Sequence, residues 1–306
     1  MPIATQEIED IEVALPAPLA RYGGTTKARL HGRRGPVVVA LGGISADRRV
    51  CDWWRGLAGS GRTLDPECLR LVGLDFAADL AGALAPSTAE QAEVLAAALD
   101  ALGIEAADLL VGASYGGMVG LALAGRRPEL VRRLAILCAP AAPHPAATAM
   151  RELQRRTVAM GLALGSGAEA LSIARGLAMT TYRTPEEFAE RFDGGIAEAG
   201  ALATSAPGAY LRARGDAYQA VMTPERFLSL SASIDRHRVD PAAIRQPTLV
   251  IGARSDRLVP PEQVEALAAA LPDAELHLLD SRYGHDSFLK ETARIGPLVA
   301  GFLAAA

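Results

Sequence analysis

Short apolar runs alternate with longer alanine-rich stretches along most of the chain. Six of these runs are almost continuously apolar, which is typical of parallel strands covered on both faces of a sheet. They cover residues 35–43, 69–76, 107–114, 132–140, 247–256 and 275–281. Helical patterns lie between these expected strands, at residues 87–103, 118–130 and 260–272. Pro260 and Pro261 suit the start of the last of these helices. This alternation predicts an α/β fold with a mostly parallel, doubly wound sheet.

The alternation stops after the fourth expected strand and resumes at the fifth. The intervening residues carry helical patterns and several glycines but no convincing strand. We therefore predict a core domain formed by residues 1–142 and 245–306, with residues 143–244 as a helical lid inserted over the carboxyl edge of the sheet. Residues 10–17 and 25–32 are expected to add two antiparallel strands at the sheet edge.

Composition and charge narrow the class of protein. A chain of 306 residues that is 50% hydrophobic can bury a large core. The net charge of −4, with no dense basic run, argues against a nucleic-acid partner. The acidic opening segment lacks the basic and apolar regions of a secretory signal, so we expect a cytoplasmic enzyme without a membrane partner. Cys51, Cys68 and Cys138 have no C-x-x-C spacing, so neither a disulfide framework nor a metal site is indicated.

The segment Gly112-Ala113-Ser114-Tyr115-Gly116 places a serine where a buried strand passes into a helix. This is the context of the G-x-S-x-G nucleophile elbow. The flanking glycines permit a strained serine backbone and a close approach of helix and strand. The serine oxygen would lie at a helix N-terminus, where backbone N–H groups and the helix dipole stabilise an oxyanion. In a chain with 30 glycines the pattern also arises by chance, so its partner residues decide its meaning.

A base and an acid for Ser114 are found later in the chain. Of the five histidines, only His285 lies in a loop after a late strand, and Asp256 ends the strand before it. The order Ser114, Asp256, His285 is that of α/β-hydrolases. Asp256 could instead cap the helix that begins near Pro260, and His285 could be a solvated loop residue. Three residues at three loop positions in this order favour a Ser-His-Asp triad.

Six motifs spread over most of the chain are similar to those of one enzyme family. They are ALGG at 40–43, CDWWRGLAGSGRTLD at 51–65, GASYGGM at 112–118, MTTYRTPEEFAERF at 179–192, SDRLVPPEQ at 255–263 and YGHDSFLKE at 283–291. With these motifs the chain resembles the homoserine O-acyltransferases, α/β-hydrolase-fold enzymes that transfer an acyl group from acyl-CoA to the hydroxyl of homoserine in methionine biosynthesis. Paired Trp53 and Trp54, the YRT segment and an aspartate after the histidine are more specific to this family than the triad is.

The resemblance implies a role for each catalytic residue. Ser114 would take the acyl group from the thioester, His285 would move the protons, and Asp256 would orient the imidazole, giving ping-pong transfer through an acyl-enzyme. The backbone N–H groups of Leu41 and Tyr115 would form the oxyanion hole. Acyl-CoA is then a substrate, and no cofactor is expected.

The acceptor-binding residues match the family only in part. Asp286 corresponds by position to the family's contact with the amino group of the acceptor. A gapless comparison puts Val221 and Phe227 where the family has an arginine that binds the homoserine carboxylate and a following tyrosine. The acceptor therefore stays open at this point. Arginines that could supply the charge from a shifted position are Arg183, Arg214 and Arg226.

The acyl donor is expected to be succinyl-CoA in preference to acetyl-CoA. The motifs at 112–118 and 233–241 are more similar to the short, succinyl-specific members of the family than to the longer, acetyl-specific ones. Arg48 and Arg49 lie just after the oxyanion loop and are candidates to bind the succinyl carboxylate, because guanidinium pairs with carboxylate bidentately. Their alternative interpretation is a solvated basic pair.

Other functions that the sequence leaves open differ in the acceptor. A serine hydrolase would share the triad and use water on a small ester or thioester, and a related acyltransferase would act on serine or another hydroxy amino acid. A non-catalytic binding protein on the same scaffold is disfavoured by the intact triad. A homodimer is also left open.

Overall fold

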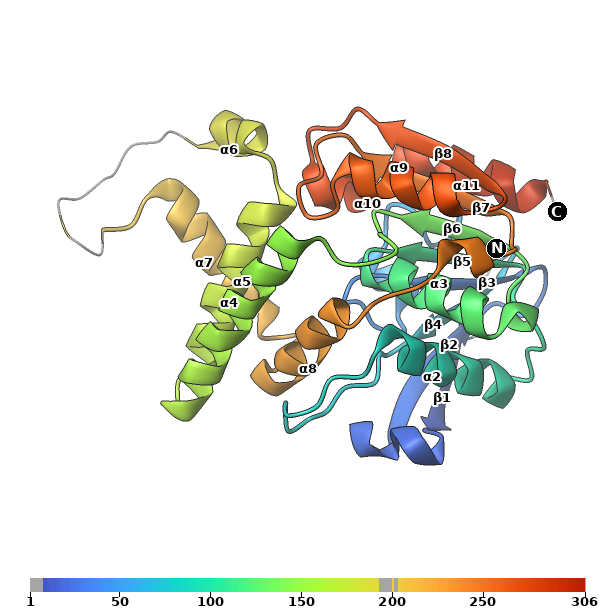
Figure 1. Cartoon of the computed structure of the whole chain (residues 1–306), viewed down its shortest axis with the longest axis horizontal. Helices are drawn as coiled ribbons and strands as arrows, with labels where there is room; N and C mark the ends of the chain where they lie inside the picture. Colours follow the sequence, from blue (N-terminus) through green and yellow to red (C-terminus); the bar gives the residue numbers. More distant parts are fainter. Residues whose placement is uncertain (1–7, 193–199, 201–202, 306) are drawn as a thin grey trace, which may run out of the picture.

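An eight-stranded sheet forms the centre of the computed structural model, which describes residues 8–192, 200 and 203–305 (Figure 1). Its strand order is β1-β2-β4-β3-β5-β6-β7-β8, with β1 and β2 antiparallel at one edge and the other strands parallel to one another. The strands are β1 (Ile8–Ala14), β2 (Thr25–His31), β3 (Val37–Leu41), β4 (Arg70–Leu74), β5 (Leu109–Ala113), β6 (Leu134–Leu137), β7 (Thr248–Ala253) and β8 (Ala274–Leu279). All six expected apolar strands and both antiparallel edge strands are confirmed.

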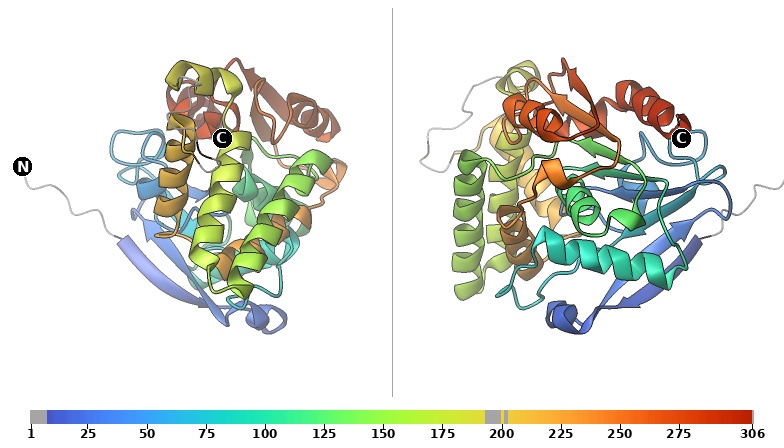
Figure 2. Two further views of the ribbon diagram at one scale, coloured as in Figure 1. Left: turned by 90° about the vertical axis from the view of Figure 1, so that its left-hand side faces the viewer. Right: turned by 45° about the vertical axis from the view of Figure 1, so that its right-hand side comes forward.

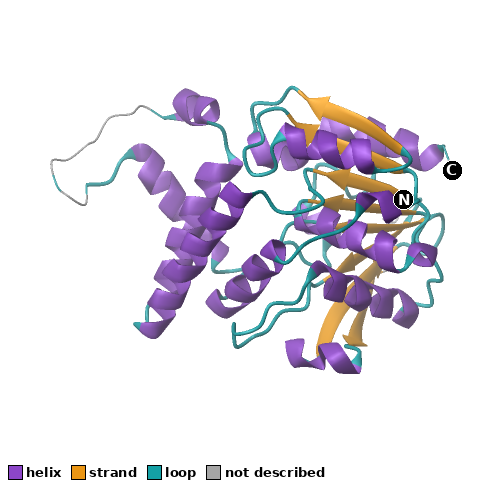
Figure 3. Ribbon diagram, in the orientation of Figure 1, coloured by secondary structure: helices purple, strands orange, loops and turns teal. Residues whose placement is uncertain are grey.

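Each central strand contributes to two hydrophobic cores, because successive side chains point to opposite faces of the sheet. On β3, Val37 and Val39 pack into one core, whereas Val38 and Ala40 pack into the other. Helices cover both faces, as Figure 3 shows. The first core is closed by α2 (Thr88–Ala101), α3 (Tyr115–Arg126) and α9 (Pro261–Ala270), and the second by α1 (Val50–Trp53), α10 (Ser287–Lys290) and α11 (Thr292–Ala304).

The expected helices are confirmed, with one difference in position. The helix α3 begins at Tyr115, directly after Ser114, instead of at residue 118, and it is followed by a short 3₁₀ turn, η2 (Pro128–Leu130). The sequence pattern starts three residues after the helix does, because Gly116 and Gly117 do not count as apolar in the pattern although they are buried. The helix α2 begins with a capping box between Ser87 and Glu90, and Pro261 occupies the first turn of α9.

The described residues between β6 and β7 form helices joined by loops and turns. The α-helices are α4 (Pro145–Ala163), α5 (Gly167–Tyr182), α6 (Pro185–Arg191), α7 (Ala206–Tyr218) and α8 (Pro224–Asp235). Residues 193–199 and 201–202 of the expected insertion lie outside the described residues. The left-hand view of Figure 2 shows α4, α5 and α7 side by side, and the parallel strands in Figure 3 point toward them. The helical character of this insertion is confirmed, and its role as a lid stays a prediction.

The two ends of the insertion are tied to the core by His237. Its Nε2 donates to the carbonyl of Pro140, 3.0 Å away, and its Nδ1 accepts from the hydroxyl of Thr88, at 2.8 Å. Pro140 follows β6, where the chain leaves the core, and His237 follows α8, where it returns. Burial lowers the pKa of His237 to about 4, so the imidazole is neutral at neutral pH. No helix among the described residues has both the length and the apolar sequence to span a membrane.

Candidate active site

Ser114 occupies a strained turn between β5 and α3. Its backbone dihedrals are φ 53° and ψ −119°, in a region that side-chain-bearing residues rarely adopt. The turn is held on both sides, because the Ser114 N–H donates to the carbonyl of Leu137 and the Ser114 carbonyl accepts from the N–H of Met118. The expected nucleophile elbow therefore has its strained backbone.

The glycines beside Ser114 let α3 approach the sheet more closely than any other residue would. A Cβ atom at Gly112 would lie 2.6 Å from the carbonyl oxygen of Gly116, and one at Gly116 would lie 2.4 Å from the backbone of Leu41. The Gly116 N–H donates to the carbonyl of Gly42 over 2.8 Å. The backbone of Leu41 thus lies against the start of α3, beside Tyr115. It stays a prediction that the backbone N–H groups of Leu41 and Tyr115 form an oxyanion hole.

Ser114, His285 and Asp256 form a continuous hydrogen-bonded series. Nε2 of His285 lies 2.9 Å from Oγ of Ser114, and Nδ1 of His285 lies 2.7 Å from Oδ2 of Asp256. A carboxylate only accepts, so Nδ1 carries the proton, and Nε2 is free to accept from the serine hydroxyl. Oδ1 of Asp256 accepts from the N–H groups of Leu258 and Val259. This is the arrangement that activates a serine for nucleophilic attack.

The structure disagrees with the alternative roles considered for Asp256 and His285, a helix cap and a solvated loop residue. The N-cap of α9 is Pro260, so Asp256 does not cap that helix. His285 is 3% exposed and packs between the rings of Tyr182 and Phe288, so it is not a solvated loop residue. Burial alone lowers the pKa of His285, but attraction to Asp256 and the hydrogen bond between them outweigh it, and the net pKa is raised.

The paired tryptophans join the loop after β3 to α10, the short helix that follows His285. Nε1 of Trp53 donates to the carbonyl of Asp47, and Nε1 of Trp54 donates to the carbonyl of Phe288, each at 3.0 Å. The two indole rings stack with centroids 4.7 Å apart. The loop after β3 and the helix next to His285 are therefore held together by the tryptophan pair.

A cavity of about 170 Å³ opens beside Ser114 between the core and the insertion. Core and insertion residues both contribute to its wall. The core supplies residues 43–46, Trp53, Tyr115, Met118, Leu258, Val259, His285 and Asp286, and the insertion supplies Met150, Arg151, Gln154, Arg175, Thr181, Tyr182 and Ile234. The wall is mostly apolar with a few charged groups, as is usual for a small-molecule site.

Asp286 lies in the cavity wall directly after His285. Its side chain is 13% exposed, and Nε of Arg183 lies 3.5 Å from its Oδ2. Burial raises the pKa of Asp286, an effect opposed by the positive charges of Arg183, His285 and Arg175. Arg183 itself points to Glu187, at 2.5 Å, and does not line the cavity. The structure thus brings Asp286 to the site and places Arg183 behind it.

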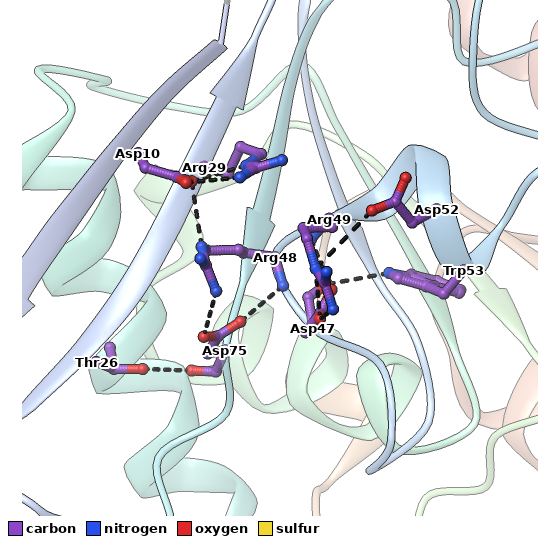
Figure 4. Close-up of polar contacts among 9 residues, drawn as sticks. All are labelled: Asp10, Thr26, Arg29, Asp47, Arg48, Arg49, Asp52, Trp53 and Asp75. Carbon is purple, nitrogen blue, oxygen red and sulfur yellow. Dashed lines mark hydrogen bonds and ion pairs between the residues drawn. The ribbon is translucent and has the colours of Figure 1, made fainter. Parts of the chain in front are cut away.

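Arg48 and Arg49 do not reach the cavity, which differs from the expectation for a succinyl-binding pair. Figure 4 shows Arg48 between Asp10 and Asp75, with N–O distances of 3.1 and 2.9 Å. Arg49 pairs with Asp47 at 2.5 Å. Both guanidinium groups already have carboxylate partners, and neither lines the wall beside Ser114. The physical reason is that the sheet edge brings Asp10 and Asp75 from other segments to Arg48, whereas Arg49 pairs with Asp47 of its own loop.

The other candidate residues of the insertion also lie outside the Ser114 cavity. Val221 is 54% exposed and Phe227 is 4% exposed, and neither lines its wall. Arg214 is exposed on α7. Arg226 lines two neighbouring cavities, one of which shares the loop at residues 44–46 with the Ser114 cavity.

Sequence reasoning missed two arginines that do line the cavity, Arg151 on α4 and Arg175 on α5. Arg175 lies seven residues before Tyr182, about two helical turns, so the two side chains share a face of α5. That spacing from the YRT motif is the signal that could have identified Arg175. Arg151 carries no comparable sequence signal.

Comparison with protein families and sequences places the chain among enzymes of one fold. Residues 54–292 match the family described as the alpha/beta hydrolase fold. A homoserine O-succinyltransferase of Xanthomonas campestris pv. campestris is 41% identical over 294 residues, which cover 91% of this chain and 80% of that protein. A homoserine O-acetyltransferase of Deinococcus radiodurans is 32% identical over 286 residues, covering 88% and 83% of the two chains.

Solved structures share the fold at low sequence identity. The crystal structure of homoserine O-acetyltransferase from Bacillus anthracis superposes with a TM-score of 0.85 at 13% identity and covers 98% of each chain. The crystal structure of esterase E22 gives a TM-score of 0.84 at 17% identity and covers 97% of this chain and 100% of that one. One of these neighbours is named as a transferase and the other as an esterase, so the fold alone does not distinguish the two reactions.

Proposed function

The chain belongs to the homoserine O-acyltransferase family of α/β-hydrolase-fold enzymes, and we propose that it transfers an acyl group from acyl-CoA to the hydroxyl of L-homoserine, with succinyl preferred over acetyl. The motif-based resemblance to this family is thereby confirmed. The observation that carries the proposal is the hydrogen-bonded series Ser114–His285–Asp256 at the wall of a cavity covered by the insertion. Acyl-CoA serves as a substrate, so the reaction needs no separate cofactor.

In the first half-reaction, Oγ of Ser114 attacks the thioester carbonyl while Nε2 of His285 takes the serine proton. The N–H groups of Leu41 and Tyr115 hold the oxyanion that forms. The carbon–sulfur bond then breaks, and His285 gives its proton to the departing CoA thiolate. The acyl group is left as an ester on Ser114, and Asp256 stabilises the imidazolium while it carries the proton.

In the second half-reaction, the acceptor hydroxyl occupies the place that CoA has left. His285 removes the hydroxyl proton, the acceptor oxygen attacks the acyl-enzyme carbonyl, and Ser114 departs and regains its proton from His285. Asp286 lies next to His285 in the cavity wall, where its carboxylate can bind the ammonium group of the acceptor. The insertion excludes water, which would otherwise hydrolyse the acyl-enzyme.

The choice of donor is supported by the sequence comparisons and not by the arginines expected to bind the donor. The relative that is 41% identical is named as a succinyltransferase, whereas those between 25% and 32% identical are named as acetyltransferases. The short motifs at 112–118 and 233–241 point in the same direction. The proposal also keeps the expected cytoplasmic location, and light scattering of the purified protein would test for a homodimer.

Thiol release tests the proposed reaction. Purified protein is mixed with succinyl-CoA or acetyl-CoA, with and without homoserine, and free CoA is followed with a thiol reagent. We expect release that depends on homoserine and is faster with succinyl-CoA. Release that is equally fast without an acceptor would identify a thioesterase instead, and no release with either donor would refute both reactions. Thiol release that is tenfold faster with acetyl-CoA than with succinyl-CoA would overturn only the donor assignment.

A further inference from the structure

Three arginines lie in or directly behind the cavity wall, and they differ in their partners. Arg151 pairs with Asp235 at 2.6 Å, and Arg183 pairs with Glu187 at 2.5 Å. No carboxylate of the described residues lies within ion-pair distance of Arg175. Its guanidinium lies instead over the faces of two aromatic rings. Arg175 is therefore a positive charge in the cavity wall that the described protein residues do not neutralise by pairing.

The aromatic contacts place this charge close to the catalytic histidine. Cζ of Arg175 lies 5.2 Å from the ring centroid of Tyr182, and the same ring lies 5.7 Å from that of His285. Cζ also lies 4.6 Å from the ring centroid of Tyr218. Guanidinium stacked on ring faces keeps its N–H groups at its edge, where they can donate to an acceptor in its plane. Arg175 is thus oriented by packing and free to bind an anion.

An opposite charge lines the same cavity. Asp286 follows His285 in the chain, and the positive charge of Arg175 acts on its carboxylate. A carboxylate and a guanidinium on one small cavity wall complement a ligand that carries both an ammonium and a carboxylate group. An α-amino acid is such a ligand.

We propose that Arg175 binds the α-carboxylate of the acceptor amino acid while Asp286 binds its ammonium group. This inference rests on the proposed function, since it names a specificity residue of that site. A succinyl group also carries a carboxylate, but it has no ammonium group to match Asp286. Val221, at the position where the family's carboxylate-binding arginine is expected, lies outside the cavity wall. Tyr218, on which Arg175 stacks, is three residues earlier in that segment.

The test pairs removal of the charge from the protein with removal of the carboxylate from the acceptor. The variant is Arg175→Gln, and the two acceptors are homoserine and 3-aminopropan-1-ol, which is homoserine without its carboxylate. Saturating acetyl-CoA is the donor, so that no donor carboxylate is present. We expect kcat/KM for homoserine to fall roughly 10- to 150-fold and kcat/KM for 3-aminopropan-1-ol to stay unchanged, as the loss of one charge-assisted pair predicts.

Two further variants separate Arg175 from other arginines of the insertion. Arg214→Gln removes a charge from the exposed surface of α7 and should change neither acceptor. Arg226→Gln removes the charge from the neighbouring cavities. A homoserine-specific loss in Arg226→Gln that is absent from Arg175→Gln would overturn the proposal. Should Arg175→Gln fail to fold, Arg175→Lys keeps the charge without the planar fork and should show a smaller loss that is still confined to homoserine.

Equal losses with both acceptors would show that Arg175 only positions Tyr182 and would overturn the proposal. The proposal would also be overturned by a variant that keeps its homoserine kinetics but, compared with the unsubstituted protein, forms the acyl-enzyme more slowly from succinyl-CoA and equally fast from acetyl-CoA. Arg175 would then bind the donor. Failure of the proposed function itself would appear in the unsubstituted protein, as thiol release that homoserine does not stimulate. That result would overturn both proposals and is distinguishable from a failure seen only in the Arg175 variants.

Discussion

Nδ1 of His285 lies 2.7 Å from Oδ2 of Asp256, and both residues are only 3% exposed. The contact does two things at once. It fixes the proton on Nδ1, which leaves Nε2 facing Ser114, and it opposes the effect of burial on the imidazole. The pKa of His285 is raised because attraction to the carboxylate outweighs the cost of burying a charged ring.

Removal of this carboxylate is expected to change both the rate and its pH dependence. His285 must be neutral to accept the serine proton, so kcat/KM should fall as the pH drops through a pKa above the ordinary value of 6.5. In Asp256→Asn only the attraction to Asp286 still opposes the burial effect, so the pKa of His285 should fall and the acid limb should move to lower pH. The rate should also fall by about 10³- to 10⁴-fold, as in other triads. Thiol release measured from pH 5 to 9 gives both quantities, and an unmoved acid limb would contradict the assignment.

Ser114→Ala tests the nucleophile. The substitution should lower kcat by several orders of magnitude, since the acyl-enzyme cannot form. The temperature of thermal unfolding should hardly change, because alanine fills the same turn with one atom fewer. Mass spectrometry after incubation with succinyl-CoA should detect one added succinyl group on the unsubstituted protein and none on the variant.

A variant that kept more than a few per cent of the activity would refute the role of Ser114. A succinyl group that remained on the variant would locate the nucleophile elsewhere. Asp256→Asn provides the control, since it keeps the serine and should still become acylated, but slowly.

The sheet and the triad could be predicted because their signals are local or follow chain order. Buried strands are continuous apolar runs, and the glycines around Ser114 mark a turn that few other sequences can form. The partners of Arg48 could not be predicted in this way. They depend on how β1, β2 and β4 align, which brings Asp10 and Asp75 from distant segments to one guanidinium. The spacing of Arg175 from the YRT motif places both on one face of a helix, but that this face lines a cavity follows only from the packing of the insertion against the core.

Gly116→Ala is expected to disrupt the elbow. The added methyl group would lie 2.4 Å from the backbone of Leu41, which cannot yield as a flexible side chain does. We expect a loss of about 1–3 kcal/mol in the free energy of unfolding and a fall of roughly 100-fold in kcat, because the helix must move away from the oxyanion loop.

Gly125→Ala in the same helix is the matched control. There the nearest atom to the new methyl group is Cγ1 of Ile244, at 3.8 Å, an ordinary contact. Alanine favours the helix over glycine by up to about 1 kcal/mol, so this variant should be as stable or more stable, with unchanged activity. Equal behaviour of the two variants in urea denaturation and thiol release would argue against the close approach of α3 and β3.

Arg48→Gln is expected to affect stability and not donor choice. The side chain joins Asp10 on β1 to Asp75 after β4, and its replacement should lower the free energy of unfolding by about 1 kcal/mol. The ratio of kcat/KM for succinyl-CoA and acetyl-CoA should stay the same, because Arg48 does not line the Ser114 cavity. Arg49→Gln, whose pair with Asp47 is more exposed, should cost less. A tenfold fall in the succinyl preference of either variant would restore the donor-binding role.

His237 is expected to make the fold sensitive to acid. The folded protein holds it neutral with a pKa of about 4, whereas in the unfolded chain its pKa returns to about 6.5. Its contribution to stability is therefore complete above pH 6.5 and is lost as the pH falls toward 4, because the unfolded state then binds a proton that the folded state does not. Between pH 7 and 5 the loss should amount to about 2 kcal/mol.

His237→Gln separates this contribution from that of the other titrating groups. Glutamine can still hydrogen-bond near Pro140 and Thr88 but does not titrate, so the variant should be less stable at pH 7 and lose about 2 kcal/mol less than the unsubstituted protein between pH 7 and 5. Urea denaturation followed by tryptophan fluorescence at the two pH values gives the comparison. Because His237 joins the two ends of the insertion to α2, acid should loosen the insertion before the sheet, and the protection of amides from hydrogen exchange, relative to their intrinsic rates, should fall at pH 5 in α4 and α8 before it falls in β5 and β6. Uniform exchange across these elements would show that His237 stabilises the whole fold and not this junction.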